Sequence, residues 1–385
     1  MRLSRPYIRT LTALFAVYLL FFALLGLVLP DRYVSSNENR NLQQLPAFSW
    51  ERLFSDAYTE ELERYLSDQF PLRDGFYALN NELSLLLGQR DFSGFYLGAD
   101  GSLLQMHDAL DAKVFRQNLA YIQAFASAAS SLSLPVRLLP VPGASYIYPE
   151  KLPYGGKEGD VDGLFDEASD GAFDLIDVRQ ALLDHKQEAL YYRTDHHWTS
   201  LGAYRAWEAY LAQTGRQATP LSAYREELLS DSFQGTGASA VGLWGLPTDR
   251  IYAYDCGQSL QLELNLNGQL YDSLLFRDHL ATRDQYAAFL NGNQPLVQIR
   301  GENRNGQHLL IVKDSYANCL AQFAIADFEQ VDLIDLRSFN GDVLQYIEEN
   351  GVTEVLVLYG VKNLCEDKNL YWLGRSAQAW SQNPS

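Results

Sequence analysis

Residues 309–318 read LLIVKDSYAN, in which four large apolar residues are followed by a polar turn and then by a helical pattern. A short apolar run bounded by a turn is typical of a strand that is buried on both faces, as in a parallel sheet. Ser315 then falls at a strand-to-helix turn, where the next helix offers backbone N–H groups to an oxyanion. Ser315 is therefore placed like a nucleophile, although a serine after a strand is more often a helix cap.

Apolar runs of this kind recur along the chain and alternate with helical patterns. The runs are residues 136–141, 173–178, 189–192, 308–313, 331–336 and 354–359. Strands that alternate with helices predict βαβ units, so the expected fold class is α/β, with a parallel sheet flanked by helices. Residues 222–301 contain turn residues and short alternating runs, which predict a β-rich insertion with hairpins. Residues 51–87 predict helices interrupted at Pro71.

The first thirty residues predict the location of the protein. Residues 11–29 are uncharged and apolar, and at 1.5 Å per residue they match the ~30 Å hydrocarbon core of a bilayer. Arg2, Arg5 and Arg9 precede this stretch, so the positive-inside rule keeps the amino terminus cytoplasmic. We expect a cytoplasmic tip and transmembrane anchor over residues 1–30. A cleaved signal peptide and a buried helix are the alternatives, but no A-x-A cleavage site follows the stretch.

The remaining chain is expected outside the cytoplasm, as a stalk at residues 31–50 and a catalytic domain at residues 51–385. The whole chain carries 30 Lys and Arg against 48 Asp and Glu, a net charge of −18, which excludes a broad electrostatic grip on nucleic acid. The apolar content of 47% predicts a folded protein rather than a disordered one. Three cysteines without a C-x-x-C pair form neither a disulfide framework nor a cysteine zinc site.

A second polar segment, Asp195-His196-His197-Trp198, contains two of the six histidines. A histidine that serves as a general base needs a carboxylate on Nδ1, which fixes its tautomer, and Asp195 with His197 is the natural pair. A helix cap by Asp195 or Thr199 is about equally compatible with the pattern. A metal site is less favoured, because adjacent residues seldom chelate one ion and no other histidine cluster supplies further ligands. Ser145, after another predicted strand, is a rival nucleophile.

These segments resemble a known family when they are taken together. Asp195-His196-His197-Trp198 is similar to the signature of the DHHW proteins, which are related to the alginate O-acetylation (AlgX/AlgJ-like) proteins of the SGNH hydrolase-like superfamily. Further segments resemble the family in the same order. They are residues 37–40 with Pro46, 68–73, 149–153, 233–236, 313–317 and 335–337. The resemblance covers roughly residues 37–362, and it implies an SGNH hydrolase-like fold.

The resemblance also implies a Ser-His-Asp triad in which Asp195 orients His197, His197 is the base and Ser315 attacks. The expected activity is transfer of an acetyl group to hydroxyls of an exopolysaccharide or cell-wall polymer, without cofactor or metal. The implied partners are the polysaccharide acceptor and a polytopic acyltransferase of the MBOAT type that delivers acetyl groups across the membrane. An acetylesterase with the same triad and a non-catalytic polysaccharide-binding scaffold are the alternatives. Candidates for binding substrate or the oxyanion are Tyr316, Asn318, Arg337 and Trp198, with Asn363 also considered.

Overall fold

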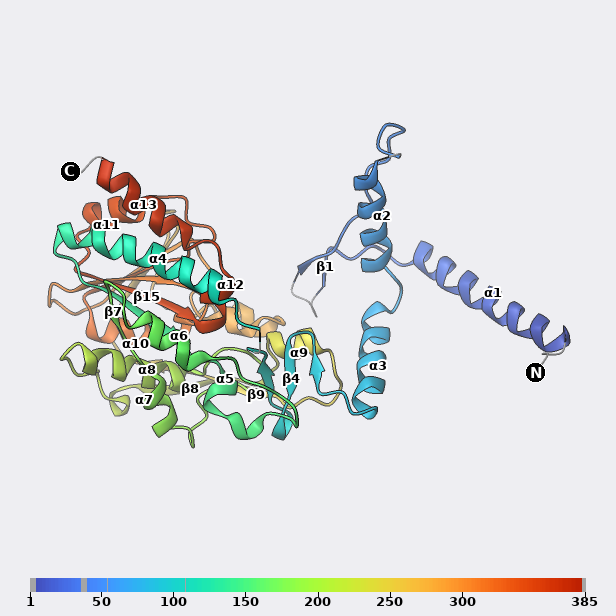
Figure 1. Cartoon of the computed structure of the whole chain (residues 1–385), viewed down its shortest axis with the longest axis horizontal. Coiled ribbons are helices and arrows are strands. Elements are labelled where there is room, and N and C mark those ends of the chain that lie inside the picture. The colour runs from blue at the N-terminus through green and yellow to red at the C-terminus, as the bar shows by residue number, and fades with distance from the viewer. Residues whose placement is uncertain (1–4, 36–39, 54, 108, 383–385) are drawn as a thin grey trace. The chain divides into compact units, whose positions relative to one another are not determined.

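The computed structural model describes residues 5–35, 40–53, 55–107 and 109–382 (Figure 1). By their internal contacts the residues form two compact units. The first comprises Met1–Gln89 with Ser239–Gly245, and the second comprises Arg90–Ala238 with Leu246–Ser385. The chain therefore passes from the second unit into the first at residues 239–245 and then returns to the second. The domain boundaries expected at residues 30 and 50 stay predictions, as do those of the insertion at residues 222–301.

An eight-stranded sheet forms the centre of the second unit, in the order β11-β10-β12-β14-β13-β15-β6-β7. Its strands are β6 (Val136–Val141), β7 (Asp174–Leu175), β10 (Gln261–Leu264), β11 (Leu270–Tyr271), β12 (Leu296–Arg300), β13 (His308–Lys313), β14 (Gln330–Ile334) and β15 (Glu354–Gly360). The strands from β14 to β7 are parallel, whereas β12, β10 and β11 extend the sheet in antiparallel fashion. The expected α/β class with a parallel sheet is therefore confirmed.

Helices cover both faces of this sheet, which explains why β13 and β15 are buried along their whole length and mostly apolar (Figure 1). Leu309 and Ile311 of β13 pack with α8 (Ser200–Gln213) and α10 (Ala317–Asp327). Leu310 and Val312 point to the other face. The helices on that face are α4 (Ala112–Ala129), α11 (Val343–Asn350), α12 (Val361–Glu366) and α13 (Tyr371–Gln382). Residues 309–312 therefore lie between two hydrophobic cores, one on each face of the sheet.

The remaining elements of this unit are short. A three-stranded sheet contains β3 (Asp91–Phe92), β4 (Phe95–Leu97) and β5 (Leu103–Gln105), and β8 (Arg225–Phe233) pairs with β9 (Asp249–Asp255). The short helices are α5 (Ala144–Ile147), α6 (Val161–Ala168), α7 (Arg179–Asp184) and α9 (Thr236–Val241), whose last three residues belong to the first unit. The 3-10 turns are η1 (Ala99–Gly101), η2 (Ser130–Leu132), η3 (Pro149–Lys151), η4 (Leu221–Ala223), η5 (Arg277–Ala281) and η6 (Gln285–Ala288).

One local prediction needs correction. Residues 189–192 were expected to form a strand, but in the structure only Tyr191 and Trp198 form an isolated antiparallel bridge. Leu190, Tyr191 and Tyr192 are buried in the core although the segment is a loop. The region 222–301 contains the β8–β9 hairpin, but its strands β10, β11 and β12 join the central sheet.

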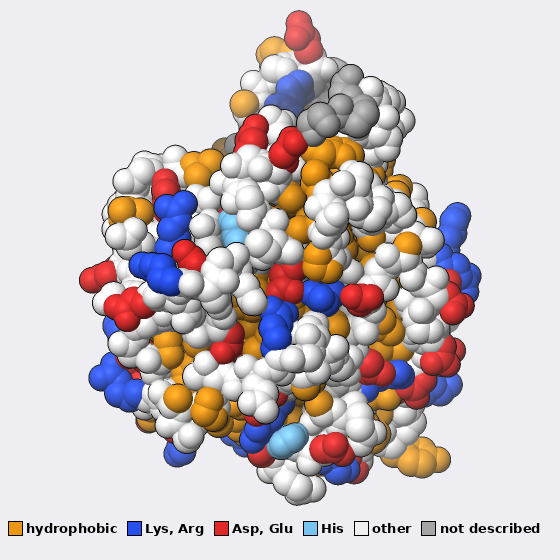
Figure 2. Space-filling view, turned by 90° about the vertical axis from the view of Figure 1, so that its left-hand side faces the viewer, with side chains coloured by type: hydrophobic (Ala, Val, Ile, Leu, Met, Phe, Trp, Pro, Cys, Tyr) orange, Lys and Arg blue, Asp and Glu red, His pale blue; other side chains and the backbone are white. Residues whose placement is uncertain are grey.

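The face of the molecule in Figure 2 carries charges of both signs. On the face that Figure 2 shows, Lys and Arg side chains are scattered singly or in small groups among Asp and Glu side chains. The basic side chains do not gather there into an extended patch. That face therefore has no continuous basic surface to which a nucleic-acid backbone could bind.

The first unit contains α1 (Arg5–Val28), β1 (Val34–Ser35), β2 (Arg40–Asn41), α2 (Asp56–Asp68) and α3 (Arg73–Leu86). Helix α1 is long and apolar enough to cross a membrane, and its place next to the amino terminus also suits a signal sequence. Arg2 and residues 37–39, on which the sequence analysis drew, lie outside the described residues. The polar segment after α1 is fixed to α2, because Arg40 Nη2 and Nη1 donate to the Asp68 carboxylate at 2.6 and 2.9 Å.

Candidate active site

Ser315 lies in the turn between β13 and α10, at the carboxyl edge of the sheet, as the sequence predicts. Its Oγ is 2.6 Å from Nε2 of His197, although the two residues are far apart in the chain. The serine is half-buried and the imidazole is 4% exposed. The expected contact between the two side chains is therefore present, at ordinary hydrogen-bond length.

Asp195 bonds to the other ring nitrogen of the same imidazole. Its Oδ1 lies 2.5 Å from His197 Nδ1 and also accepts from the His197 backbone N–H at 2.9 Å. The segment is held from beneath by Asp249, which accepts from the backbone and hydroxyl of Thr194 at 2.8 and 2.6 Å. Thr199, not Asp195, caps α8, because its side chain accepts from the backbone N–H of Gly202. Asp195 is thus free of the capping role.

Residues of a third segment hold the second oxygen of Asp195. Oδ2 accepts from the backbone N–H of Thr236 at 2.7 Å and from its hydroxyl at 2.9 Å. Gly235 must be a glycine, since a Cβ there would lie 2.1 Å from that oxygen. Burial favours the neutral acid, but the electrostatic interaction with the two neighbouring imidazoles and the hydrogen bonds from His197 prevail and hold the pKa of Asp195 well below its usual range. A carboxylate fixed in this way can stabilise an imidazolium.

His196 does not join the chain of contacts to Ser315. Its Nδ1 is 2.7 Å from the hydroxyl of Thr236, and its ring lies against that of His197 with centroids 3.8 Å apart. Burial and the neighbouring charge of His197 lower the pKa of His196 to about 3, so it is neutral at physiological pH. Possible ligand atoms of Asp195, His196 and His197 lie within 4.8 Å of one another, a spacing that a metal ion would accept. The expectation of a metal-free site stays a prediction.

Aromatic side chains enclose the imidazole of His197. The ring of Tyr286 stacks on it, with centroids 4.2 Å apart and planes 11° apart, and the Tyr286 hydroxyl donates to the backbone oxygen of Ser315 at 3.1 Å. On another side, the Trp198 indole N–H donates to the backbone oxygen of Tyr316 at 2.9 Å. The Tyr316 hydroxyl in turn donates to the backbone oxygen of His196 at 2.6 Å. These contacts fix the ring between the two segments that carry the site.

Asp314 ties the turn of Ser315 to the neighbouring strand. Its Oδ1 accepts from the Tyr316 backbone N–H at 3.0 Å, and its Oδ2 accepts from Gly360 and from the Asn363 side chain, both at 2.7 Å. Burial is the main cause that raises the pKa of Asp314. The turn that presents Ser315 is therefore held by the end of β15 as well as by β13.

The candidate oxyanion donors already have acceptors within the protein. Asn363 and the backbone N–H of Tyr316 bind Asp314, and the Trp198 indole binds the backbone of Tyr316. Arg337 donates to Asp335 at 2.8 and 2.5 Å, and Asn318 Nδ2 donates to Asn293 at 3.2 Å while its Oδ1 accepts from Lys313 at 2.8 Å. Any role of these donors toward a substrate oxygen stays a prediction.

The rival nucleophile Ser145 also meets a histidine, but in a different arrangement. Its Oγ is 2.9 Å from Nδ1 of His107, and Glu158 Oε1 is 3.1 Å from that same nitrogen. In a Ser-His-Asp triad the nucleophile and the acid bind opposite nitrogens of the imidazole. Ser145 is also only 1% exposed. Its surroundings are therefore those of a structural hydrogen bond.

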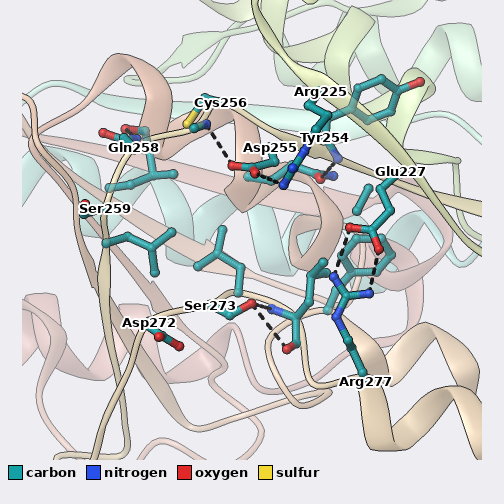
Figure 3. Close-up of a pocket in the computed structure, with 18 of the residues that line it drawn as sticks. Arg225, Glu227, Tyr254, Asp255, Cys256, Gln258, Ser259, Asp272, Ser273 and Arg277 are labelled. Atoms are coloured by element: carbon teal, nitrogen blue, oxygen red, sulfur yellow. Dashed lines mark hydrogen bonds and ion pairs between the residues drawn. The ribbon is translucent and has the colours of Figure 1, made fainter.

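A cavity of about 360 Å³ borders α10, the helix that follows Ser315 (Figure 3). Asn318 and Gln322 of α10 contribute to one wall. Figure 3 shows two ion pairs on another part of the lining. They are Arg277 with Glu227, at 2.8 and 2.9 Å, and Arg225 with Asp255, at 2.7 Å. Both guanidinium groups are neutralised by carboxylates, so this wall has no excess of positive charge.

The central sheet and its helices define the class as an α/β protein with a largely parallel sheet. Residues 175–334 match the family model described as DHHW protein. Residues 97–245 match the model described as SGNH hydrolase-like domain, acetyltransferase AlgX. Each of the two matched ranges contains Asp195 and His197, and the first range also contains Ser315. The resemblance to DHHW and AlgX-like proteins, first inferred from short segments, is confirmed.

Solved structures share the fold of this chain. A DHHW family protein from Eubacterium siraeum is 23% identical, with a TM-score of 0.62, and the match covers 74% of this chain and 96% of that one. The structure of Bacillus cereus PatB1 with a sulfonyl adduct is 18% identical, with a TM-score of 0.60, and the match covers 73% and 98%. Among proteins of curated function, none matches this chain significantly.

Proposed function

We propose that this chain is a membrane-anchored, extracytoplasmic O-acetyltransferase that acts on hydroxyls of an exopolysaccharide or cell-wall polymer. The observation that carries the proposal is the chain of contacts from Ser315 through His197 to Asp195, at 2.6 and 2.5 Å. The match to an acetyltransferase family model favours acetyl transfer over other reactions of the same three groups.

The first half-reaction forms an acetyl-enzyme. His197 Nε2 takes the proton of the Ser315 hydroxyl while Oγ attacks the acetyl carbonyl carbon of the donor. Asp195 stabilises the imidazolium that forms. When the tetrahedral intermediate collapses, the bond to the donor oxygen breaks and the leaving group takes the proton from His197. Ser315 then carries the acetyl group as an ester.

The second half-reaction transfers the acetyl group to the polymer. A sugar hydroxyl gives its proton to His197 and attacks the ester carbonyl, and Ser315 leaves with that proton. Water in place of the sugar would make the protein an esterase. The Tyr286 ring stacked on His197 supports transfer, because an aromatic wall beside the base limits the access of water.

The proposed location requires a donor that crosses the membrane, since acetyl-CoA is not available outside the cell. A polytopic acyltransferase of the MBOAT type would supply the acetyl group next to α1, which we propose as an uncleaved anchor. A non-catalytic polysaccharide-binding scaffold is the remaining alternative. The two-sided hydrogen bonding of the His197 ring favours a catalyst, because a binding surface does not require it.

The test uses the purified full chain in detergent, because segment 239–245 belongs to the same unit as α2 and α3. The protein is incubated with p-nitrophenyl acetate and with sugar oligomers, and mass spectrometry follows released acetate and acetylated oligomer. We expect acetylated oligomer with the native chain and none with Ser315→Ala. Acetate alone would identify an esterase, and neither product would support the scaffold.

A matched control comes from the second serine–histidine contact of the chain. Ser145→Ala removes a hydroxyl at 2.9 Å from an imidazole nitrogen, as Ser315→Ala does, but should leave turnover nearly unchanged. A sulfonyl fluoride should label Ser315 and not Ser145, because sulfonylation requires an activated and accessible hydroxyl. Peptide mapping that finds the label on Ser145 would refute the assignment of the nucleophile.

A further inference from the structure

Helix α3 and the residue before it carry an apolar stripe that is largely exposed. The stripe consists of Leu72, Phe76, Leu79, Leu83 and Leu86, whose spacing of four and three residues places them along one side of a helix. These side chains are between 40% and 81% exposed. In a soluble helix such a stripe faces the core, so its exposure here requires another partner.

The opposite side of α3 is the side that packs within the unit. Ala78 and Asn81 are each 6% exposed. Asn81 Nδ2 donates to the backbone oxygen of Val241 at 2.7 Å, and the Tyr77 hydroxyl donates to that of Ala240 at 2.9 Å. At 100° per residue, these positions lie roughly opposite the apolar stripe. The helix therefore cannot rotate its leucines inward without breaking these bonds.

The stripe begins where α1 ends. The ring of Phe22 on α1 stacks on Phe70 at 5.4 Å and lies 5.6 Å from Phe76, the second residue of the stripe. Phe22 is inside the apolar stretch 11–29, about 10 Å along the helix from its end at residue 29. If α1 spans the bilayer, Phe70 and Phe76 lie at the depth of Phe22, below the headgroups of the outer leaflet.

We propose that α3 is an interfacial helix whose apolar stripe is embedded in the lipid leaflet that α1 enters. This inference rests on the proposed anchor and extends it. The membrane would hold the unit at two helices, α1, which spans the bilayer, and α3, which lies in the interface. An amphipathic helix in such a position buries its apolar face about 5–10 Å into the leaflet, which suits the depth inferred from Phe22. Helix α3 carries only Arg73, Asp74 and Glu82 as charges, so the embedding should not require anionic lipid.

The experiment measures the depth of single labels on the full chain in vesicles of pure phosphatidylcholine. Cys256→Ser removes the half-exposed thiol, and Cys319 and Cys365 are buried. An environment-sensitive fluorophore is then attached at Leu83→Cys or, as the matched control one residue onward and 100° around the helix, at Ser84→Cys. Doxyl-labelled phosphatidylcholine serves as the quencher. Retained ester hydrolysis verifies that each labelled chain is folded.

We expect the label at position 83 to shift to shorter wavelength and to lose most of its intensity to the doxyl lipid, with a much smaller loss at position 84. A blue shift at position 83 without quenching would mean that protein covers the stripe, either a partner or a second copy, and would overturn the proposal. A label that remains in water would overturn it as well. A third label at Leu20→Cys on α1 tests the anchor separately: quenching at position 20 without quenching at position 83 would refute only the interfacial helix.

Discussion

Replacement of Gly235 by alanine should disable the site without unfolding the protein. A Cβ at this position would lie 2.1 Å from Oδ2 of Asp195 and 2.3 Å from its Cβ, whereas ordinary contacts begin near 3.4 Å. Asp195 must therefore move by more than about 1 Å, and its contact with His197 must lengthen. A 1 Å misplacement of a catalytic group costs about 10²-fold in rate, and loss of the triad carboxylate costs about 10⁴-fold. The fall in kcat should lie between these two values, which corresponds to a rise in the activation free energy of about 3 to 5 kcal/mol.

The assay is hydrolysis of p-nitrophenyl acetate by the full chain, with thermal unfolding and near-ultraviolet circular dichroism as measures of folding. Gly75→Ala is the matched control, since a Cβ there meets nothing within 4 Å. Neither glycine has the positive φ that only glycine adopts readily, so backbone strain does not complicate the comparison. A Gly235→Ala protein that keeps its native spectrum and its kcat would refute the argument that Asp195 must stay where it is.

Three further predictions concern the histidines, pH and the anchor. His197→Ala should lower kcat by about 10³-fold or more, as loss of a triad base does, whereas His196→Ala should cost no more than about tenfold, the worth of one hydrogen bond; equal losses with sensitivity to EDTA would instead indicate a metal site. Because the folded-state pKa of Asp195 lies below its unfolded value near 3.9, its contribution to stability is complete above about pH 5 and is lost as the pH falls; urea unfolding between about pH 6 and 3 should therefore show a steeper loss for the native chain than for Asp195→Asn, and parallel curves would contradict the low pKa. Removal of residues 1–30 should leave ester hydrolysis intact but reduce polymer acetylation in cells, because the effective concentration at the donor is lost; unchanged acetylation would argue against delivery at the membrane.

The sequence predicted the strands that are buried on both faces, and the reason is physical. Residues 309–312 are all apolar because helices cover both sides of β13, so their pattern has no other ready explanation. Residues 189–192 have a similar composition but form a loop, in which Leu190, Tyr191 and Tyr192 fill the core without a neighbouring strand. The composition of a segment therefore indicates whether it is buried. Whether it pairs as a strand depends on which other segments the fold places beside it.

The sequence indicated the three side chains that meet in the candidate site, but not the residues that surround them. Asp195, His197 and Ser315 stand out by their chemistry and their place after predicted elements. The Gly235-Thr236 pair left a usable signal, because a glycine beside a hydroxyl residue suits a close approach to a buried acid. The sequence contains no signal for Tyr286, which lies on the short turn η6. Its ring stacks on His197 only because of the way in which residues 222–301 fold.

The position of β15 determines when during biosynthesis the site can form. β15 is the last strand of the chain, yet it lies between β13 and β6 in the sheet. Until residues 354–363 are made, β6 has no parallel partner linking it to β13, and Asp314 lacks its bonds to Gly360 and Asn363. A growing chain therefore contains Ser315 and His197 long before it can hold them together. The enzyme should remain inactive throughout its own synthesis and become competent only when its final strand closes the sheet.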